Sequence, residues 1–295
     1  MSAAPRHSTS MVDLQAQICS DLISAVTVVD GKTALDFENP KSAVVVTYGE
    51  TQEETLDRCL THHVRHVCQT DAGSLESELN TSALMVRNPD QFLQFPLAAI
   101  LSPTNVSAAS EKRLTALSHS FSSATDKSAT LGELRQKLVD EGRSESLIAD
   151  AVLVADEMFT NAIFNAPFVD PKTGFNPGID RSDDTVKMKN GRHAELFMGY
   201  DQNRLAIVCR DPYGSLNLKQ FLRRIHDCST GGVSAAMRMG SGGAGIGSHM
   251  VFNISSSMYV GVSRGKSTVV GACIHWKWSG RRRSEATKNF HCFEY

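Results

Sequence analysis

The sequence predicts an α/β protein built in two units, and three observations support this. Apolar runs of strand length alternate with helical stretches before residue 110. A segment rich in Ser, Thr and Ala, 104–130, then reads as a linker or a polar helix. Beyond it, long helical periodicity precedes two hairpin patterns. We therefore expect a polar arm, a small α/β module, a larger α/β domain and a basic tail, at 1–40, 41–110, 111–280 and 281–295.

The first unit is defined by short segments with different periodicities. The arm holds one helical candidate, Leu14 to Ile23. The module is expected to contain a strand at 43–47, a helix at 52–63, strands at 66–68 and 84–86, and a closing strand at 97–101. This alternation resembles a response-regulator receiver. Such a receiver would be degenerate, because no strand ends in a clear phosphoacceptor aspartate. We expect this module to contact a partner protein.

The second unit carries stronger signals. Helical spacing predicts helices at 131–138 and 147–164, with Ser144 or Ser146 as the cap of the second. Pro, Gly and Asp clusters make 167–192 a long loop. Two hairpins are expected, with strands at 194–200, 204–209, 257–262 and 268–276.

Composition excludes several classes of function. Thirty Lys and Arg against 32 Asp and Glu give a net charge of -2, so no global field attracts nucleic acid. The apolar runs are far shorter than the roughly 20 residues of a membrane-spanning helix, and the first residues do not form a secretory leader. Seven scattered cysteines without a CxxC pair suit reduced thiols. We expect a cytoplasmic protein without membrane insertion or direct nucleic-acid binding.

The first candidate site element lies on the helix at 147–164. Glu157 and Asn161 are four residues apart, so both project from one helical face. An amide oxygen suits Mg²⁺, and a carboxylate beside it could orient or deprotonate a hydroxyl. Taken singly, the pair is better interpreted as a solvated surface of an amphipathic helix.

Two further elements follow in the chain. Asp211 and Gly214 come directly after a strand, where a carboxylate can accept a hydrogen bond from an exocyclic amine. The stretch from Gly240 to Gly247 holds five glycines and precedes an apolar helical segment. Such a loop offers backbone amides and a favourable helix dipole to phosphate oxygens.

Two rival motifs fail on their context. Gly240 to Gly245 matches G-x-G-x-x-G, but no strand precedes it and no acid lies about 20 residues further on. Gly265-Lys266-Ser267 is similar to the end of a Walker P-loop, but the required earlier glycine is Val260 and a strand follows. The sequence therefore favours neither a Rossmann domain nor a P-loop.

Together, these elements resemble the Bergerat-fold (GHKL) ATPases, a family shared by histidine kinases, gyrase, MutL and anti-sigma-factor serine kinases. Glu157-x-x-x-Asn161-Ala162 resembles the family's N box, and Asp211 to Gly214 its first glycine box. Gly243 to Gly247 resembles the second glycine box, and Lys266 to Val270 the closing hairpin. The likeness spans most of residues 130–276. One departure is that the usual Asp-x-Gly-x-Gly is here Asp211-Pro-Tyr-Gly214-Ser.

The resemblance implies an α/β sandwich that holds ATP and Mg²⁺ between helices and a mixed sheet. It implies that Asn161 binds Mg²⁺ and that Glu157 is the catalytic base. It places Asp211 and Thr268 at the adenine and makes 215–239 a mobile lid. The glycines that it places at the nucleotide are Gly214, Gly243, Gly245 and Gly247.

The layout most resembles the anti-sigma-factor serine kinases, which bind a sigma factor or phosphorylate an antagonist protein. We expect an ATP-dependent regulatory serine kinase or switch acting on such a partner, with a homodimer left open. The alternatives are a nucleotide-gated binding module, a degenerate scaffold without ATP, and a histidine kinase. For the last, His119 is the nearest candidate phosphoacceptor, but it reads better as a surface histidine. Two His and Cys pairs, Cys59 with His63 and His62 with His66, have metal-ligand spacing but are common by chance.

Overall fold

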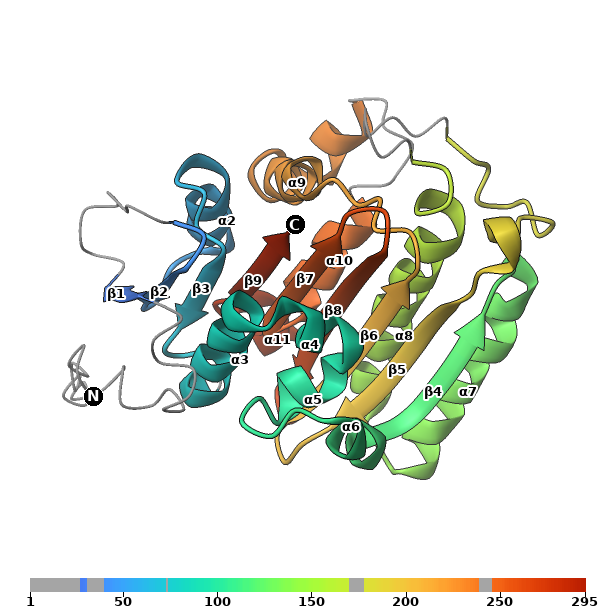
Figure 1. Cartoon of the computed structure of the whole chain (residues 1–295), viewed down its shortest axis with the longest axis horizontal. Coiled ribbons are helices and arrows are strands. Elements are labelled where there is room, and N and C mark those ends of the chain that lie inside the picture. Colours follow the sequence, from blue (N-terminus) through green and yellow to red (C-terminus); the bar gives the residue numbers. More distant parts are fainter. Residues whose placement is uncertain (1–26, 31–39, 73, 170–177, 239–245) are drawn as a thin grey trace.

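The computed structural model describes residues 27–30, 40–72, 74–169, 178–238 and 246–295. The nine strands of this described part form one mixed sheet in the order β1-β2-β3-β9-β7-β8-β6-β5-β4 (Figure 1). Helices cover both faces of the sheet. The expected α/β class is therefore confirmed.

One end of the sheet comes from the first part of the chain. Strands β1 (Thr27–Asp30), β2 (Ala43–Thr47) and β3 (His66–Gln69) are parallel. Helix α2 (Gln52–Thr61) connects β2 to β3 and begins with a capping box between Thr51 and Glu54. The predicted strand and helix here are confirmed, with the helix ending two residues earlier than expected.

Two expected strands of this region are helices instead. Residues 84–86 lie within α3 (Leu75–Arg87), which Ser74 caps, and 97–101 form α5 (Pro96–Leu101). Between them lies α4 (Pro89–Gln94). A proline begins each of the two short helices, where its missing N–H costs nothing. The prediction was wrong because apolar runs this short do not distinguish a buried strand from a buried helix.

The segment 104–130, expected to be a linker or a polar helix, also contains a strand. Helix α6 (Ala108–Leu114) is followed directly by β4 (Thr115–Phe121), which pairs antiparallel with β5 at the edge of the sheet. Its side chains are mostly half-buried or exposed, so it lacks the apolar alternation of a core strand. A short 3₁₀ turn, Ala124–Asp126, leads on to the next helix.

The second part of the chain follows the predicted order. Helices α7 (Lys127–Asp140) and α8 (Glu145–Thr160) precede the hairpin of β5 (Ala194–Tyr200) and β6 (Arg204–Asp211). Helices α9 (Leu218–Arg238) and α10 (Ile246–Ile254) precede the hairpin of β7 (Ser257–Ser263) and β8 (Ser267–His275). Both predicted hairpins are confirmed. A 3₁₀ turn, Lys189–Gly191, lies in the loop before β5.

The expected basic tail is instead part of the core. Residues 280–285 form α11, and β9 (Asn289–Glu294) lies between β3 and β7, antiparallel to the first and parallel to the second. Arg283 is buried and pairs with Asp150, while Lys288 Nζ donates to the Asn253 carbonyl at 2.7 Å. The prediction was wrong for Arg283 and Lys288, which have partners from distant segments, whereas Arg281 and Arg282 are exposed. Strands from both expected units thus meet in one sheet at β9.

The two faces of the sheet carry separate cores. In β2, Val45 belongs to the core on one face together with α2 residues, whereas Val44 and Val46 belong to the core on the other face with α3 residues. Helices α7 to α10 cover the first face, and α3 to α5 cover the second (Figure 1). Burial on both faces explains the continuous apolar runs of the central strands. No helix in the described ranges is both long and apolar enough to cross a membrane.

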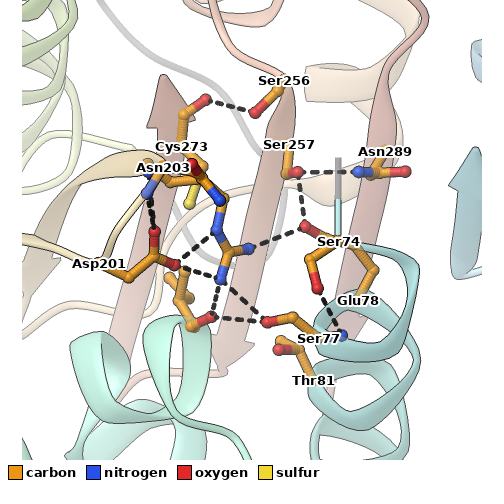
Figure 2. A network of polar contacts seen from close by, with 12 residues as sticks. Ser74, Ser77, Glu78, Thr81, Asp201, Asn203, Ser256, Ser257, Cys273 and Asn289 are labelled. Carbon is orange, nitrogen blue, oxygen red and sulfur yellow. Dashed lines mark hydrogen bonds and ion pairs between the residues drawn. The ribbon is translucent and has the colours of Figure 1, made fainter. Parts of the chain in front are cut away.

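A buried polar network joins α3 to the sheet (Figure 2). Glu78 accepts hydrogen bonds from Ser257 Oγ at 2.8 Å, Tyr259 Oη at 2.7 Å and Arg204 Nη1 at 3.2 Å, and His291 Nε2 lies 3.0 Å away. Burial raises the pKa of Glu78, but these partners outweigh it and leave the pKa below its ordinary value. The network ties the segment 75–87 to three strands of the second half.

Candidate functional site

A ladder of polar side chains runs along the end of α8. Glu157, Asn161 and Asn165 follow at four-residue intervals, and the helix passes into a π-helical turn at Asn161–Asn165. Asn161 Nδ2 donates to Glu157 Oε1 at 2.8 Å, and Asn165 Nδ2 donates to Asn161 Oδ1. Single π turns are frequent at functional sites. The remaining surface of α8 is largely buried, through residues such as Ala151, Val154 and Ala155.

Glu157 lies in a confined position. Its side chain is 12% exposed, and its Oε2 is 3.9 Å from Arg181 Nη1. A Cβ added to Gly247 would lie 1.9 Å from the same Oε2, so a side chain at this point of α10 would have to displace the Glu157 carboxylate. Burial raises the pKa of Glu157, while Arg181 and the bond from Asn161 lower it in part. The predicted base and one predicted phosphate-loop glycine are therefore direct neighbours.

Asp211 ends β6 and lies opposite Thr268 in β8. Its carboxylate accepts a hydrogen bond from the Tyr213 backbone N–H at 2.9 Å. Burial raises the pKa of Asp211 from 3.8 to about 6, against the lowering effect of the Tyr213 amide and the Thr268 hydroxyl. Thr268 Oγ1 is buried and has no hydrogen bond of normal geometry within the described ranges. Both side chains thus have capacity for further hydrogen bonds.

These residues share one pocket. Glu157, Asn161, Asp211 and Thr268 all line it, and Ser248, next to Gly247, lines it as well. The pocket holds about 990 Å³ of space, part of it open to solvent. Its walls are largely apolar, with contributions from Met158, Ala162, Phe221, Val251, Met258 and Val270. The structure therefore brings together side chains from three separate stretches of the chain. Gly243 and Gly245 lie outside the described residues.

Gly214 has a different position from the one expected. It does not line the pocket but packs on the β7–β8 turn, where its φ is +58°. The neighbouring Ser215, at the family's second glycine position, donates from Oγ to the Ala166 carbonyl at 2.8 Å. The loop after β6 is therefore anchored on both sides, and Gly214 has a structural rather than a pocket-lining position.

Replacing Gly214 with alanine should destabilise the fold strongly. Its Cβ would lie 2.0 Å from the Ser263 carbonyl oxygen, and backbone cannot move away cheaply. We expect Gly214→Ala to lower the free energy of unfolding by more than about 2 kcal/mol. Gly265 is the matched control, since its φ is +70° but a Cβ there meets nothing within 4 Å. Urea unfolding of both variants tests this, and equal losses would show that the close contact is unimportant.

Other pocket residues were not identified from the sequence. Asn165 continues the four-residue spacing of Glu157 and Asn161 and could have been found by that signal. Asn217 and Arg224 belong to the segment expected as a lid, most of which is the helix α9. One side of α9 is buried through Leu218, Leu222 and Ile225. Movement of this segment stays a prediction.

The remaining candidates lie elsewhere. His119 is half-buried in β4, with Nδ1 2.8 Å from Glu133 Oε2 of α7. The pairs of Cys59 with His63 and of His62 with His66 belong to no larger group, because the described residues contain no cluster of three potential metal ligands.

No protein-family model matches this chain, and no curated protein matches it significantly. The assignment of a function therefore depends on the chemistry of the pocket.

Proposed function

We propose that this pocket binds ATP with Mg²⁺ and that the chain is a Bergerat-type regulatory ATPase, acting as a serine kinase or switch on a partner protein. The observation that carries the proposal is the convergence of Glu157 and Asn161 with Asp211 and Thr268 in one pocket. These residues come from helix α8 and from two adjacent strands. The order of the elements and the mixed sheet also fit that family.

The adenine end of the pocket fits a purine. Asp211 offers a carboxylate acceptor for an exocyclic amine, and the neighbouring Thr268 hydroxyl makes no hydrogen bond of normal geometry within the described part of the chain. Apolar side chains such as Met258 and Val270 supply walls for a flat ring.

The opposite end fits phosphates and a divalent cation. Asn161 Oδ1 accepts one bond from Asn165 and keeps a second lone pair for a metal ligand bond. A bound Mg²⁺ would offset the charge of the phosphates. The first turn of α10 offers backbone amides, and the close approach at Gly247 would be blocked by any side chain.

Glu157 is suited to act on a hydroxyl. Its raised pKa makes it a better proton acceptor than an exposed carboxylate, and the bond from Asn161 fixes one of its oxygens. In the proposed reaction, a serine hydroxyl of the partner attacks the terminal phosphorus, its proton passes to Glu157, and ADP leaves. A histidine acceptor within this chain is less suited, because His119 lies in a strand and not on a helical hairpin.

Nucleotide binding is tested by thermal unfolding with ATP and Mg²⁺. At a ligand concentration 100 times Kd, binding adds about 2.7 kcal/mol, so the wild type should gain about 5 °C or more. Asn161→Ala should lose this gain, because the metal ligand is removed. Asn105→Ala, an exposed residue between α5 and α6, should keep it. No gain in the wild type would contradict the proposal and leave a scaffold without ATP.

Transfer chemistry needs a second measurement on the same proteins. Glu157→Gln preserves the acceptor for Asn161 but cannot take a proton, so it should bind ATP and lose about 10²-fold or more of the transfer rate. Radiolabel transfer from ATP to co-purified proteins measures this. Unchanged transfer in Glu157→Gln would remove the assigned base. Binding without any transfer in the wild type would indicate a nucleotide-gated module.

A further inference from the structure

Arg181 is a cation beside the proposed reaction centre that no motif indicated. Its Nη1 lies 3.9 Å from Glu157 Oε2, which is longer than the roughly 2.7 to 2.9 Å of a charge-assisted hydrogen bond. Its Nη2 is buried and has no hydrogen-bond partner in the described part of the chain. An arginine normally satisfies such a nitrogen, because an unpaired charged donor is costly to bury. The guanidinium therefore has an unused donor next to Glu157.

The acids of its own loop do not neutralise Arg181. Asp180 Oδ1 accepts from the backbone N–H and the hydroxyl of Ser182, at 2.9 and 2.7 Å. Asp183 Oδ1 accepts from Thr185 in the same way, at 2.9 and 2.6 Å. These two local turns hold the loop backbone around Arg181, and neither carboxylate forms an ion pair with it in the described structure. The loop presents the guanidinium toward α8 in a defined position.

A second cation near Glu157 is already engaged. Both Arg181 and Lys127 act on the Glu157 carboxylate, with Arg181 the stronger. Lys127 forms an ion pair with Asp156 and lies 3.5 Å from the Thr160 hydroxyl. Among the described residues, Arg181 forms an ion pair with Glu157 alone, and it lies next to a pocket that another cation, Arg224, lines directly.

Glu157 Oε2 is also the atom that Gly247 approaches, whereas Oε1 faces Asn161. A terminal phosphate placed for attack must lie near the base, the metal ligand and the first turn of α10. A carboxylate there repels the phosphate unless a positive charge lies nearby. The planar fork of an arginine matches phosphate oxygens well.

We propose that Arg181 binds the terminal phosphate of the nucleotide and makes this pocket select ATP over ADP. This inference rests on the proposed function and adds the residue that binds the terminal phosphate of ATP. A purely structural ion pair with Glu157 would instead affect both nucleotides alike.

The experiment measures Kd for ATP and for ADP, each with Mg²⁺, by isothermal titration calorimetry on the full chain. For Arg181→Gln, we expect the Kd for ATP to rise about 10- to 100-fold, the range of a lost charged hydrogen bond. The Kd for ADP should stay within about twofold. Arg181→Lys should recover part of the loss, because it keeps the charge without the fork. Lys127→Gln, the matched control, should leave the ratio of the two constants unchanged.

Each result has a distinct meaning. If the wild type binds neither nucleotide, the proposed function fails. If it binds both and Arg181→Gln weakens both equally or neither, the role of Arg181 fails while the proposed function stands. An equal change in the ratio of the two Kd values in Lys127→Gln would also overturn the role of Arg181. A general loss of positive charge would then explain the effect.

A measurement on the wild type avoids dependence on variants. Phenylglyoxal modifies accessible arginines, and the Arg181 side chain is 31% exposed. ATP with Mg²⁺ should protect Arg181 from modification, as read by peptide mass spectrometry, whereas ADP with Mg²⁺ should not. Arg281, with an 85% exposed side chain, is the internal reference and should react equally in all samples. Equal protection by both nucleotides would contradict the inference.

Discussion

At pH 8, Asp211→Asn should unfold at a higher temperature than the wild type and yet lose most of its affinity for adenine nucleotides. The ordinary pKa of 3.8 and the raised pKa of about 6 differ by an amount equivalent to about 3 kcal/mol. The folded state holds this proton more tightly than the unfolded state. The contribution of the proton to the free energy of unfolding is therefore complete below pH 3.8. It is lost as the pH rises through about 6. At pH 8 the buried charge is a cost that asparagine does not have.

The loss of affinity has a separate cause. Asparagine offers a neutral oxygen where the proposal needs a carboxylate acceptor, so the Kd for ATP and for ADP should both rise about tenfold or more. Thermal unfolding from pH 4 to pH 8 and calorimetry at pH 8 measure the two effects. Asp140→Asn, an exposed residue at the end of α7, should behave like the wild type in both.

Two outcomes would contradict this account. A difference in stability that does not change with pH would show that burial of the Asp211 charge is not its origin. Full nucleotide affinity in Asp211→Asn would place the adenine elsewhere. The opposite signs of the two expected effects are informative, because a misfolded variant would lose both stability and binding.

The second large effect concerns Glu78. Glu78→Gln should lower the free energy of unfolding by about 3 to 5 kcal/mol, the usual result of breaking a buried ion pair on one side. The Arg204 guanidinium, only 5% exposed, would lose the charge of one of its two acidic partners. The amide would also turn a donor toward Tyr259 or Ser257, which both donate to the carboxylate.

Glu76 provides the matched control for this prediction. It lies on the same helix but is exposed, so Glu76→Gln should leave the urea midpoint unchanged. A loss of less than about 1 kcal/mol in Glu78→Gln would show that the network is replaceable. A double-mutant cycle with Arg204→Met would then measure the coupling of the pair directly.

The sequence predicted the elements with long or regular periodicity. Helix α8 and both hairpins were predicted because their spacing is sustained and their turns have typical residues. The polar face of α8 also pointed to Glu157 and Asn161, which lie in the pocket with Asp211. Local patterns were sufficient here because each candidate lies at the end of a well-defined element.

The errors arose where distant contacts decide the structure. The partners of Glu78 lie 126 to 213 residues away in the chain, so no local pattern indicates a buried network. Arg283 and Lys288 look solvated until Asp150 and the Asn253 carbonyl are placed beside them. Arg181 was assigned only to a loop, because its proximity to Glu157 depends on how that loop folds back.

The position of β9 has a consequence for how the molecule assembles. Strands β3 and β7 do not pair with each other, and only residues 289–294 bridge them. During synthesis, the two halves of the sheet can therefore be joined only after β9 has left the ribosome, and β9 follows all the other described strands in the chain. Until it arrives, each half exposes an open edge capable of pairing with another chain. Completion of the described sheet thus depends on β9, which follows every other strand of that sheet in the chain.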